Sequence, residues 1–207
     1  MAVVIAVAQQ KGGAGKTTIA ANLAAALATS MAVAVLDIDP QRSLARWHAL
    51  RGAREPAITL SQVSGWRMDA ELERLRRAHG AVVVDSPPVV DEDARRAVRA
   101  ADLVLVPVQP SPPDLWAAAG TLKLAAEERR RAVLLMNRAP AAGALRAAAE
   151  AAIAEAGWAR LGAVLGNRVA FATAFARGAG VTETAPRSPA AAELLAVLEE
   201  TRRLWKN

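Results

Sequence analysis

Short, mostly apolar runs alternate with alanine-rich amphipathic stretches along most of the chain. Runs of this length with few polar positions are typical of strands that are buried on both faces of a parallel sheet. We expect strands at Val3–Ala8, Ala32–Asp37, Ala57–Leu60, Ala81–Asp85, Leu103–Pro107, Ala132–Asn137 and Ala163–Leu165. With helical stretches between most of them, the pattern predicts an α/β fold, a doubly wound, mainly parallel sheet with helices on both faces.

The segment from Asp91 to Ala101 shows how one of these helices is encoded. Ala94, Ala97 and Val98 recur at the spacing that places side chains on one face of a helix. Acidic residues occupy the expected first turn and arginines follow, an order that suits the helix dipole. We therefore expect a helix here that buries one face.

Length and composition fit a single domain covering residues 1–207. At 207 residues and 53% hydrophobic, the chain can bury a full core. The proline-rich stretch 107–113 is too short to be a linker, and we find no internal repeat. No apolar run reaches the roughly 18 residues of a membrane span, and the first strand begins almost at Met1. We therefore expect no signal peptide and a cytoplasmic location.

A glycine-rich segment, Lys-Gly-Gly-Ala-Gly-Lys-Thr-Thr, directly follows the first expected strand. A strand, a glycine-rich turn and a helix in this order point backbone N–H groups at one spot that suits a polyphosphate. In the P-loop pattern, Lys16 reaches the β- and γ-phosphates and the Thr17 hydroxyl ligates Mg²⁺. The residues that would surround the nucleotide are Gly12, Gly13, Ala14, Gly15, Lys16, Thr17 and Thr18. The alternative is a strand-to-helix turn that binds no ligand.

Lys11 and Gln10 depart from the general P-loop pattern, which has a glycine at position 10. A lysine at the front of the loop is badly placed for the phosphates held by Lys16, and better placed for a nucleotide in a facing subunit. The octapeptide resembles the deviant Walker A motif of the ParA/MinD family of P-loop ATPases. In that family two subunits sandwich two ATP molecules. The resemblance implies an ATP-dependent homodimer in which Lys11 acts catalytically on the partner's phosphates.

Two expected strands end in aspartates beside this loop. Asp37 and Asp39 alternate along one strand end and so project the same way. They resemble the family's Asp-x-Asp-Pro-Gln motif, which implies that Asp37 binds Mg²⁺ through water and that Asp39 orients the attacking water. Asp85 resembles the Walker B aspartate near Mg²⁺.

Further motifs extend the resemblance over nearly the whole chain, most closely to small ParA partition ATPases that lack a helix-turn-helix extension. Asn137 and Arg138 resemble an Asn-Arg pair whose amide reads adenine in MinD-like members, although asparagine also ends strands for local reasons. The stretch 107–114 resembles a ParA loop near the dimer interface. Trp116 follows that loop and is a candidate for the same interface.

The formal net charge is +6, and the excess is arginine, because lysine occurs at only four positions. Compositional bias and nucleic-acid binding both explain such an excess. The resemblance implies binding to double-stranded DNA without sequence preference, hence a nucleoid-associated location and steep salt dependence. Arg187, in a Pro-Arg-Ser segment similar to that of larger ParA chains, and Arg168 are the candidates for DNA contacts. Arg168 is equally explained as an ordinary surface charge.

Two residue types that are absent from the sequence argue against particular classes of protein. The sequence has no cysteine, which excludes disulfides and thiolate metal sites and argues against relatives with an iron–sulfur cluster. The absence of tyrosine argues against the bacterial tyrosine kinases that share this fold.

We expect a ParA-like ATPase with weak intrinsic hydrolysis that partitions or positions a cargo: a plasmid, a chromosome region or a protein cluster. Its activator would be ParB-like or another cargo-bound protein. The alternative is a MinD-like membrane-associated regulator of division-site or flagellar placement, anchored by the stripe of Leu194, Leu198, Thr201 and Trp205. Acidic residues on the opposite face favour a helix docked on the sheet and no membrane partner. A metabolic enzyme of the dethiobiotin synthetase or cobyrinate amidase kind is the least favoured.

Overall fold

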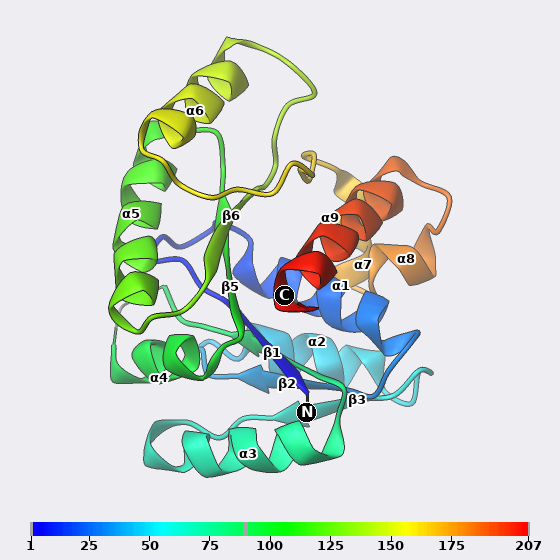
Figure 1. Cartoon of the computed structure of the whole chain (residues 1–207). Helices are drawn as coiled ribbons and strands as arrows, with labels where there is room; N and C mark the ends of the chain where they lie inside the picture. Colours follow the sequence, from blue (N-terminus) through cyan, green and yellow to red (C-terminus); the bar gives the residue numbers. More distant parts are fainter. Residues whose placement is uncertain (1, 89–90, 207) are drawn as a thin grey trace.

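The computed structural model describes residues 2–88 and 91–206. Its centre is a sheet of parallel strands in the order β3-β2-β4-β1-β5-β6 (Figure 1). The strands are β1 (Val3–Val7), β2 (Val33–Asp37), β3 (Ile58–Ser61), β4 (Ala81–Asp85), β5 (Leu103–Val108) and β6 (Ala132–Met136). This arrangement confirms the predicted parallel α/β fold.

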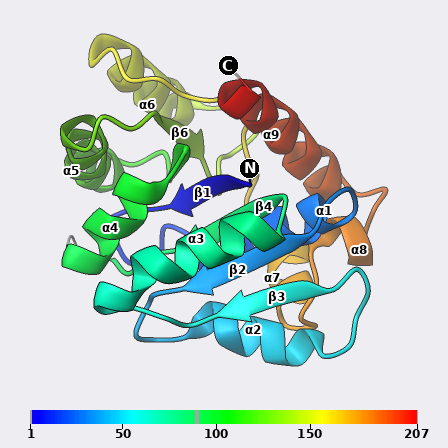
Figure 2. The same ribbon diagram turned by 60° about the horizontal axis from the view of Figure 1, so that its bottom comes forward.

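Helices cover both faces of the sheet (Figures 1 and 2). One layer holds α1 (Lys16–Ala28), α2 (Ser43–Arg51), α7 (Val169–Phe175), α8 (Val181–Thr184) and α9 (Pro189–Lys206). The other holds α3 (Met68–Ala78), preceded by the 3₁₀ turn η1 (Gly65–Arg67), α4 (Glu92–Ala100), α5 (Pro112–Glu127) and α6 (Ala144–Glu155). In β1, Ile5 and Val7 face the α1 layer, whereas Val4 and Ala6 face the α4 layer. Burial on both faces explains why the strands carry so few polar residues.

The helix predicted from Asp91 to Ala101 is confirmed as α4. The Asp91 side chain caps it by accepting a hydrogen bond from the Ala94 N–H at 2.8 Å, which satisfies a donor that the helix itself leaves open. Ala94, Ala97 and Val98 are buried, as the spacing predicted.

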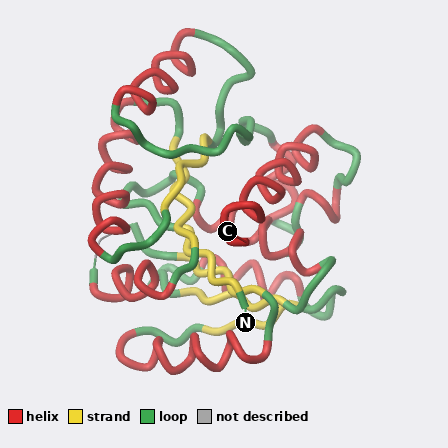
Figure 3. The backbone as a smooth tube through the Cα atoms, in the orientation of Figure 1, coloured by secondary structure: helices red, strands yellow, loops and turns green. Residues whose placement is uncertain are grey.

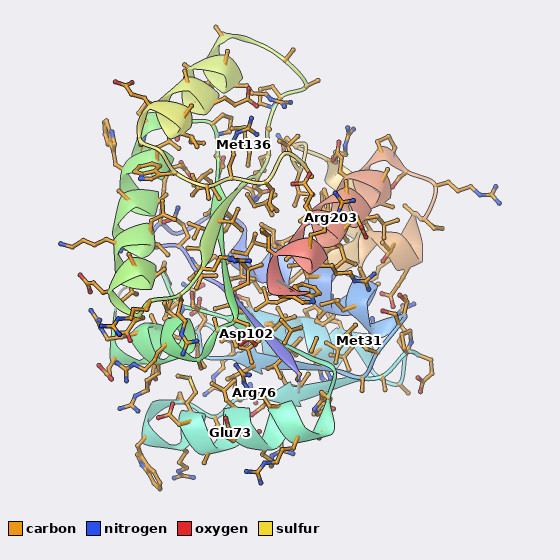
Figure 4. The ribbon with its side chains drawn as sticks, in the orientation of Figure 1. Met31, Glu73, Arg76, Asp102, Met136 and Arg203 are labelled. Atoms are coloured by element: carbon orange, nitrogen blue, oxygen red, sulfur yellow. The ribbon has the colours of Figure 1, made fainter. Side chains whose placement is uncertain are left out.

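Most arginines of α3 and α4 have carboxylate partners. Arg95 contacts Glu128 at 2.7 Å, and Arg76 of α3 contacts Asp102 at 3.2 Å, as their neighbouring positions in Figure 4 show. Exposed pairs of this kind add little to stability, but they cancel charge locally. This layer therefore contributes little to the positive net charge.

The prediction of a strand at Ala163–Leu165 is wrong. In the structure this part of the chain is a loop (Figure 3). The neighbouring backbone does bond to β6, because the Leu161 N–H donates to the Leu134 carbonyl at 2.9 Å. The next such bond runs from the Leu165 N–H to the Met136 carbonyl, also at 2.9 Å. An unbroken parallel ladder would use the N–H of residue 163 at that point, so two extra residues bulge out.

The bulged backbone finds its partner on α9 instead. The Glu200 carboxylate accepts hydrogen bonds from the N–H groups of Gly162 and Ala163, at 2.7 and 2.8 Å. The pattern of apolar residues could not reveal this, because the competing acceptor lies 37 residues further along the chain.

The C-terminal helix α9 lies on the core, as the charge pattern favoured. Leu194, Leu198 and Thr201 are buried, and Trp205 packs against the same cluster. Within residues 2–88 and 91–206, no helix is both long enough and apolar enough to cross a membrane.

Gly178 is expected to be essential for the packing of α2 against the segment before α8. It has φ +62°, and an added Cβ would lie 2.1 Å from the Arg51 backbone nitrogen. Gly157 has a similar φ of +66° but open space around it. We predict that Gly157→Ala costs about 1–2 kcal/mol for the left-handed backbone, and that Gly178→Ala costs about 1–3 kcal/mol more because backbone atoms must move. Urea unfolding measures both; equal losses would contradict the clash.

Candidate functional site

The glycine-rich loop lies between the carboxyl end of β1 and the start of α1. Gly13 and Gly15 have φ values of +79° and +95°, a conformation that other residues rarely adopt. Gly15 is the N-cap of α1, where no side-chain cap hydrogen bond is made among the described residues and no acidic residue occupies the first turn. The N–H groups at this helix end are therefore free to bind an anion.

Asn137, at the end of β6, braces the loop from the side. Its Nδ2 donates to the Ala14 carbonyl at 2.8 Å, and its Oδ1 accepts from the Arg138 N–H at 2.9 Å. A Cβ on Gly15 would lie 2.4 Å from that Nδ2, so glycine is required here for space as well as for backbone conformation. One Nδ2 hydrogen and one Oδ1 lone pair of Asn137 remain for a ligand.

The structure brings the predicted aspartates together beside Lys16. Asp37 and Asp85 end adjacent strands and are register neighbours, both with no exposed surface. Asp37 accepts hydrogen bonds from the N–H groups of Asp39 and Ala45, at 3.1 and 2.8 Å. Both carboxylate oxygens of Asp85 are buried without a hydrogen-bond partner among the described residues. A buried carboxylate in this condition calls for a proton or a cation.

Burial governs the protonation of this cluster. It raises the pKa of Asp85 to about 7; the neighbouring Thr17 hydroxyl and the Lys16 ammonium oppose that rise, and the charges of Asp37 and Asp39 add to it. Burial also raises the pKa of Asp37, against the two backbone N–H groups that it binds. The pKa of Lys16 is lowered by burial, although the carboxylates of Asp85 and Asp39 oppose that change.

These groups fit Mg²⁺ in one specific way. Among the described residues, no three His, Cys, Asp or Glu side chains gather closely enough to enclose a metal ion. Mg²⁺ commonly keeps several waters and takes only one or two carboxylates together with substrate phosphates. The buried, unpartnered Asp85 next to Asp37 and Thr17 suits such a site.

Two adjoining cavities open at the loop. The smaller, of about 230 Å³, is lined by the loop glycines, Lys16, Thr17 and Asp39. The larger, of about 320 Å³, is lined by Asn137, Phe171 and the segment 165–169, among others. Gly15, Thr18 and Arg138 border both. The smaller cavity is thus lined by glycine backbone, an ammonium, a hydroxyl and a carboxylate, and the larger one has a mixed apolar and amide wall.

Sequence reasoning missed most of the larger cavity's wall. Asn22 lines it from α1, accepts a hydrogen bond from the Val181 N–H at 2.9 Å and donates to the Thr18 carbonyl at 2.8 Å. In the sequence, Asn22 could have been noticed as the single polar residue within an apolar run of alanine and leucine. In the segment 165–169, Leu165 was assigned to the expected strand and Arg168 was considered only as a DNA contact, so nothing in the sequence placed this segment at the cavity.

The two arginines expected to contact DNA have different surroundings. Arg168 borders the larger cavity and is ion-paired with Glu193 of α9, Nε to Oε1 at 2.9 Å. Its charge is therefore largely compensated. Arg187 is exposed in the segment between α8 and α9.

Lys11 lies at the front of the loop in an ion pair with Asp114, which sits in the first turn of α5. Asp114 is 1% exposed and also accepts a hydrogen bond from the Ser111 hydroxyl at 2.6 Å. Burial alone would raise the pKa of Asp114, but the hydrogen bonds from Lys11 and Ser111 outweigh it and hold that pKa below its usual value. The stretch 107–114 was noticed as a motif, but this pairing was not.

The buried Asp85 carboxyl should make the ligand-free protein less stable at neutral pH. Its folded pKa of about 7 lies above the value of about 4 in an unfolded chain. Its contribution to stability is therefore complete below about pH 4 and lost as the pH rises through about 7. Without nucleotide or divalent cations, we predict that Asp85→Asn is more stable than the wild type at about pH 8, by roughly 2–4 kcal/mol.

Urea unfolding at about pH 5 and about pH 8 checks this. The exposed control Asp69→Asn should keep the wild-type dependence on pH. A parallel dependence in wild type and Asp85→Asn would contradict the assignment.

Comparisons with known proteins identify the family of this chain. Residues 5–181 match the family model of the CobQ/CobB/MinD/ParA nucleotide binding domain. The maintenance of carboxysome distribution protein A of Halothiobacillus neapolitanus is 31% identical over 197 residues, 91% of each chain. The protein of the same name from Gloeobacter kilaueensis is 48% identical over 115 residues, which span 54% of this chain and about half, 51%, of that relative.

A solved structure agrees at the level of the fold. A variant of Cyanothece McdA in complex with ATP superimposes with a TM-score of 0.79 at 18% identity, covering 98% of this chain and 96% of that one. The resemblance seen in the sequence motifs is confirmed. The chain belongs to the CobQ/CobB/MinD/ParA family of nucleotide-binding domains.

Proposed function

We propose that this protein is a ParA-like ATPase that positions a cargo by cycling between a nucleotide-bound dimer on DNA and free monomers. The observation that carries the proposal is the combination of a phosphate loop, the second lysine Lys11 at its front, and buried aspartates beside it. A general P-loop site has a phosphate loop and an aspartate near Mg²⁺ but does not need the second lysine.

ATP is the substrate that fits the two cavities. Its phosphates would lie in the 230 Å³ cavity against the loop N–H groups and Lys16, and its nucleoside in the 320 Å³ cavity beside Asn137. Thr17 and Asp85, with Asp37 acting through water, would hold Mg²⁺, which supplies positive charge against the phosphate oxygens. Asp39 lines the phosphate cavity and would orient the attacking water. We place no arginine finger among the described residues, and therefore expect slow intrinsic turnover.

Lys11 supports a dimer in which each subunit completes the other's site. In the single chain its side chain is 38% exposed and its ammonium contacts Asp114, while the Lys16 ammonium lies 3.4 Å from the Lys11 carbonyl. A facing subunit's phosphates would offer Lys11 a more highly charged partner than one carboxylate.

An exposed basic surface supports the DNA part of the proposal. The segments 40–57 and 166–188 together carry seven arginines and only two glutamates, with no aspartate or lysine. They pack together: the Trp47 indole donates to the Ala179 carbonyl at 3.2 Å, and buried Arg51 pairs with Glu183 at 2.7 Å.

Four arginines of this surface are free to meet phosphates. Arg46, Arg54, Arg177 and Arg187 are exposed, and no ion pair joins them to a described acidic residue. No exposed aromatic side chain lies in these segments, so stacking with single-stranded bases is not favoured. The surface instead suits the phosphates of a duplex, read without sequence preference.

The relatives support a cargo-positioning role, since two of them are named for the maintenance of carboxysome distribution. We propose that the cargo, whether a plasmid, a chromosome region or a protein cluster, carries the protein that activates hydrolysis. The membrane-associated alternative has less support, because the apolar stripe of α9 that would enter the lipid is packed on the core.

Replacing Lys11 tests the dimer. We predict that Lys11→Ala binds ATP·Mg²⁺ within about twofold of the wild type, yet remains monomeric with ATP in light scattering, because only the facing subunit's phosphates lose a ligand. Lys123→Ala, an exposed lysine on α5, is the control and should dimerise normally. An ATP dimer of Lys11→Ala would rule out the role in trans.

Binding to duplex DNA of arbitrary sequence tests the proposal that the nucleotide-bound protein associates with DNA. We predict binding with ATP or a non-hydrolysable analogue but not with ADP, weakening steeply with salt. In the triple variant Arg46→Gln, Arg54→Gln, Arg177→Gln, the slope of log affinity against log salt should flatten by about 3.

A matched variant removes three charges elsewhere: Lys123→Gln, Arg129→Gln, Arg130→Gln, all exposed. This variant lowers the net charge by the same amount but should leave the slope nearly unchanged, because its three side chains lie outside the surface that we propose contacts DNA. If the wild type ignores DNA in every nucleotide state, the DNA part of the proposal is wrong, and binding to anionic liposomes then tests the membrane alternative.

A further inference from the structure

Two carboxylates of α9 contact the backbone that leads into and forms one wall of the larger cavity. Glu193 and Glu200 are seven residues apart and so share a face of the helix. Glu200 accepts from the N–H groups of Gly162 and Ala163, at 2.7 and 2.8 Å. Glu193 accepts from the Gly166 N–H at 3.0 Å and pairs with Arg168.

These contacts replace the ladder that the bulge interrupts. Buried or half-buried backbone N–H groups need acceptors, and a carboxylate is a stronger acceptor than a neutral carbonyl. Small residues let the carboxylates approach: an added Cβ on Gly162 would lie 3.2 Å from Glu200 Oε1, and one on Gly166 would lie 3.3 Å from Glu193 Oε1.

The helix that carries these carboxylates is itself firmly packed. Leu194, Val197 and Leu198 are at most 3% exposed and belong to the core shared with α1 and β1. The two glutamates therefore project from a rigid element. By contrast, the segment that they hold has no regular secondary structure of its own.

The held segment continues directly into the cavity wall. Leu165, Gly166, Asn167 and Arg168 all line the 320 Å³ cavity. Backbone pairing with the β6 side ends here: Leu165 bonds to Met136 and Ala139, and Gly166 forms an isolated parallel bridge with Ala139. At this end of the pairing Glu193 adds side-chain contacts to the Gly166 N–H and to Arg168.

We propose that Glu193 and Glu200 are positioning residues for the nucleoside of the bound nucleotide, an inference that rests on the proposed binding of ATP in these cavities. The two glutamates fix the wall that contacts the nucleoside and leave the phosphate loop untouched. Affinity for the nucleoside part thus depends on a helix that contributes no residue to the phosphate cavity. By linkage, nucleoside binding also stabilises the docking of α9.

Comparing nucleotides with inorganic tripolyphosphate, which needs only the phosphate loop, tests the inference. We predict that Glu193→Ala raises the Kd for ATP and ADP at least tenfold, since charged hydrogen bonds to Gly166 and Arg168 are lost. Glu200→Ala should raise it less, because its contacts lie further from the cavity. The Kd for tripolyphosphate should stay within about twofold, measured by titration calorimetry with Mg²⁺.

Two variants sharpen the test. Glu199→Ala removes an exposed carboxylate of the same helix, whose ion-pair partner among the described residues is Arg203, at 3.3 Å, and this variant should bind every ligand like the wild type. Glu193→Gln keeps an acceptor oxygen for the Gly166 N–H and should recover most of the ATP affinity.

The outcomes separate the inference from the proposed function. Equal losses for ATP and tripolyphosphate in Glu193→Ala would mean a general defect of the fold and overturn the inference, as would unchanged affinities for both. A wild-type protein that binds neither ATP nor tripolyphosphate would overturn the proposed function itself.

Discussion

The structure depends on keeping one helix end open. The N–H groups at the start of α1 have no side-chain cap, although a cap is the usual means of stabilising a helix end. Helix α1 can tolerate this because its other surfaces are buried almost completely against the sheet, α2, α7 and α9. Stability that is missing at the helix end is thus supplied by packing along the helix, and the open end remains a binding surface for an anion.

The buried carboxylates of Asp37 and Asp85 likewise cost stability in the free protein and suit the binding of a ligand. The carboxyl ends of β2 and β4 place Asp37 and Asp85 side by side with no exposed surface, an arrangement that costs stability unless a cation or proton joins them. Lys16 offsets part of that cost from within the loop. The site is therefore matched to a ligand that brings both negative phosphate for the loop and positive metal for the aspartates.

The sequence revealed those parts whose cause is local. Short buried runs identified β1 to β6, and the spacing of Ala94, Ala97 and Val98 identified α4, because periodic burial leaves a periodic pattern. The loop and its aspartates were visible because glycine and strand-end carboxylates are needed at fixed offsets. The expected strand at residues 163–165 failed, since Glu200 competes for its N–H groups. The Lys11–Asp114 and Arg168–Glu193 pairs were invisible for the same reason: each depends on a partner distant in sequence.

Distant contacts of this kind fix both the loop and the wall of the adjoining cavity. Asn137 at the end of β6 holds the Ala14 carbonyl, Asp114 on α5 holds Lys11, and Glu193 on α9 holds the cavity wall. Each contact comes from an element that packs in the core, so the loop's geometry is fixed by the finished fold and not by its own sequence. Glycine lets the loop backbone adopt the conformation that phosphate binding needs. The side chains that contact the loop and the cavity wall then hold them in one conformation. A phosphate loop alone makes a nucleotide site possible; the surrounding contacts determine what lies beside the phosphates.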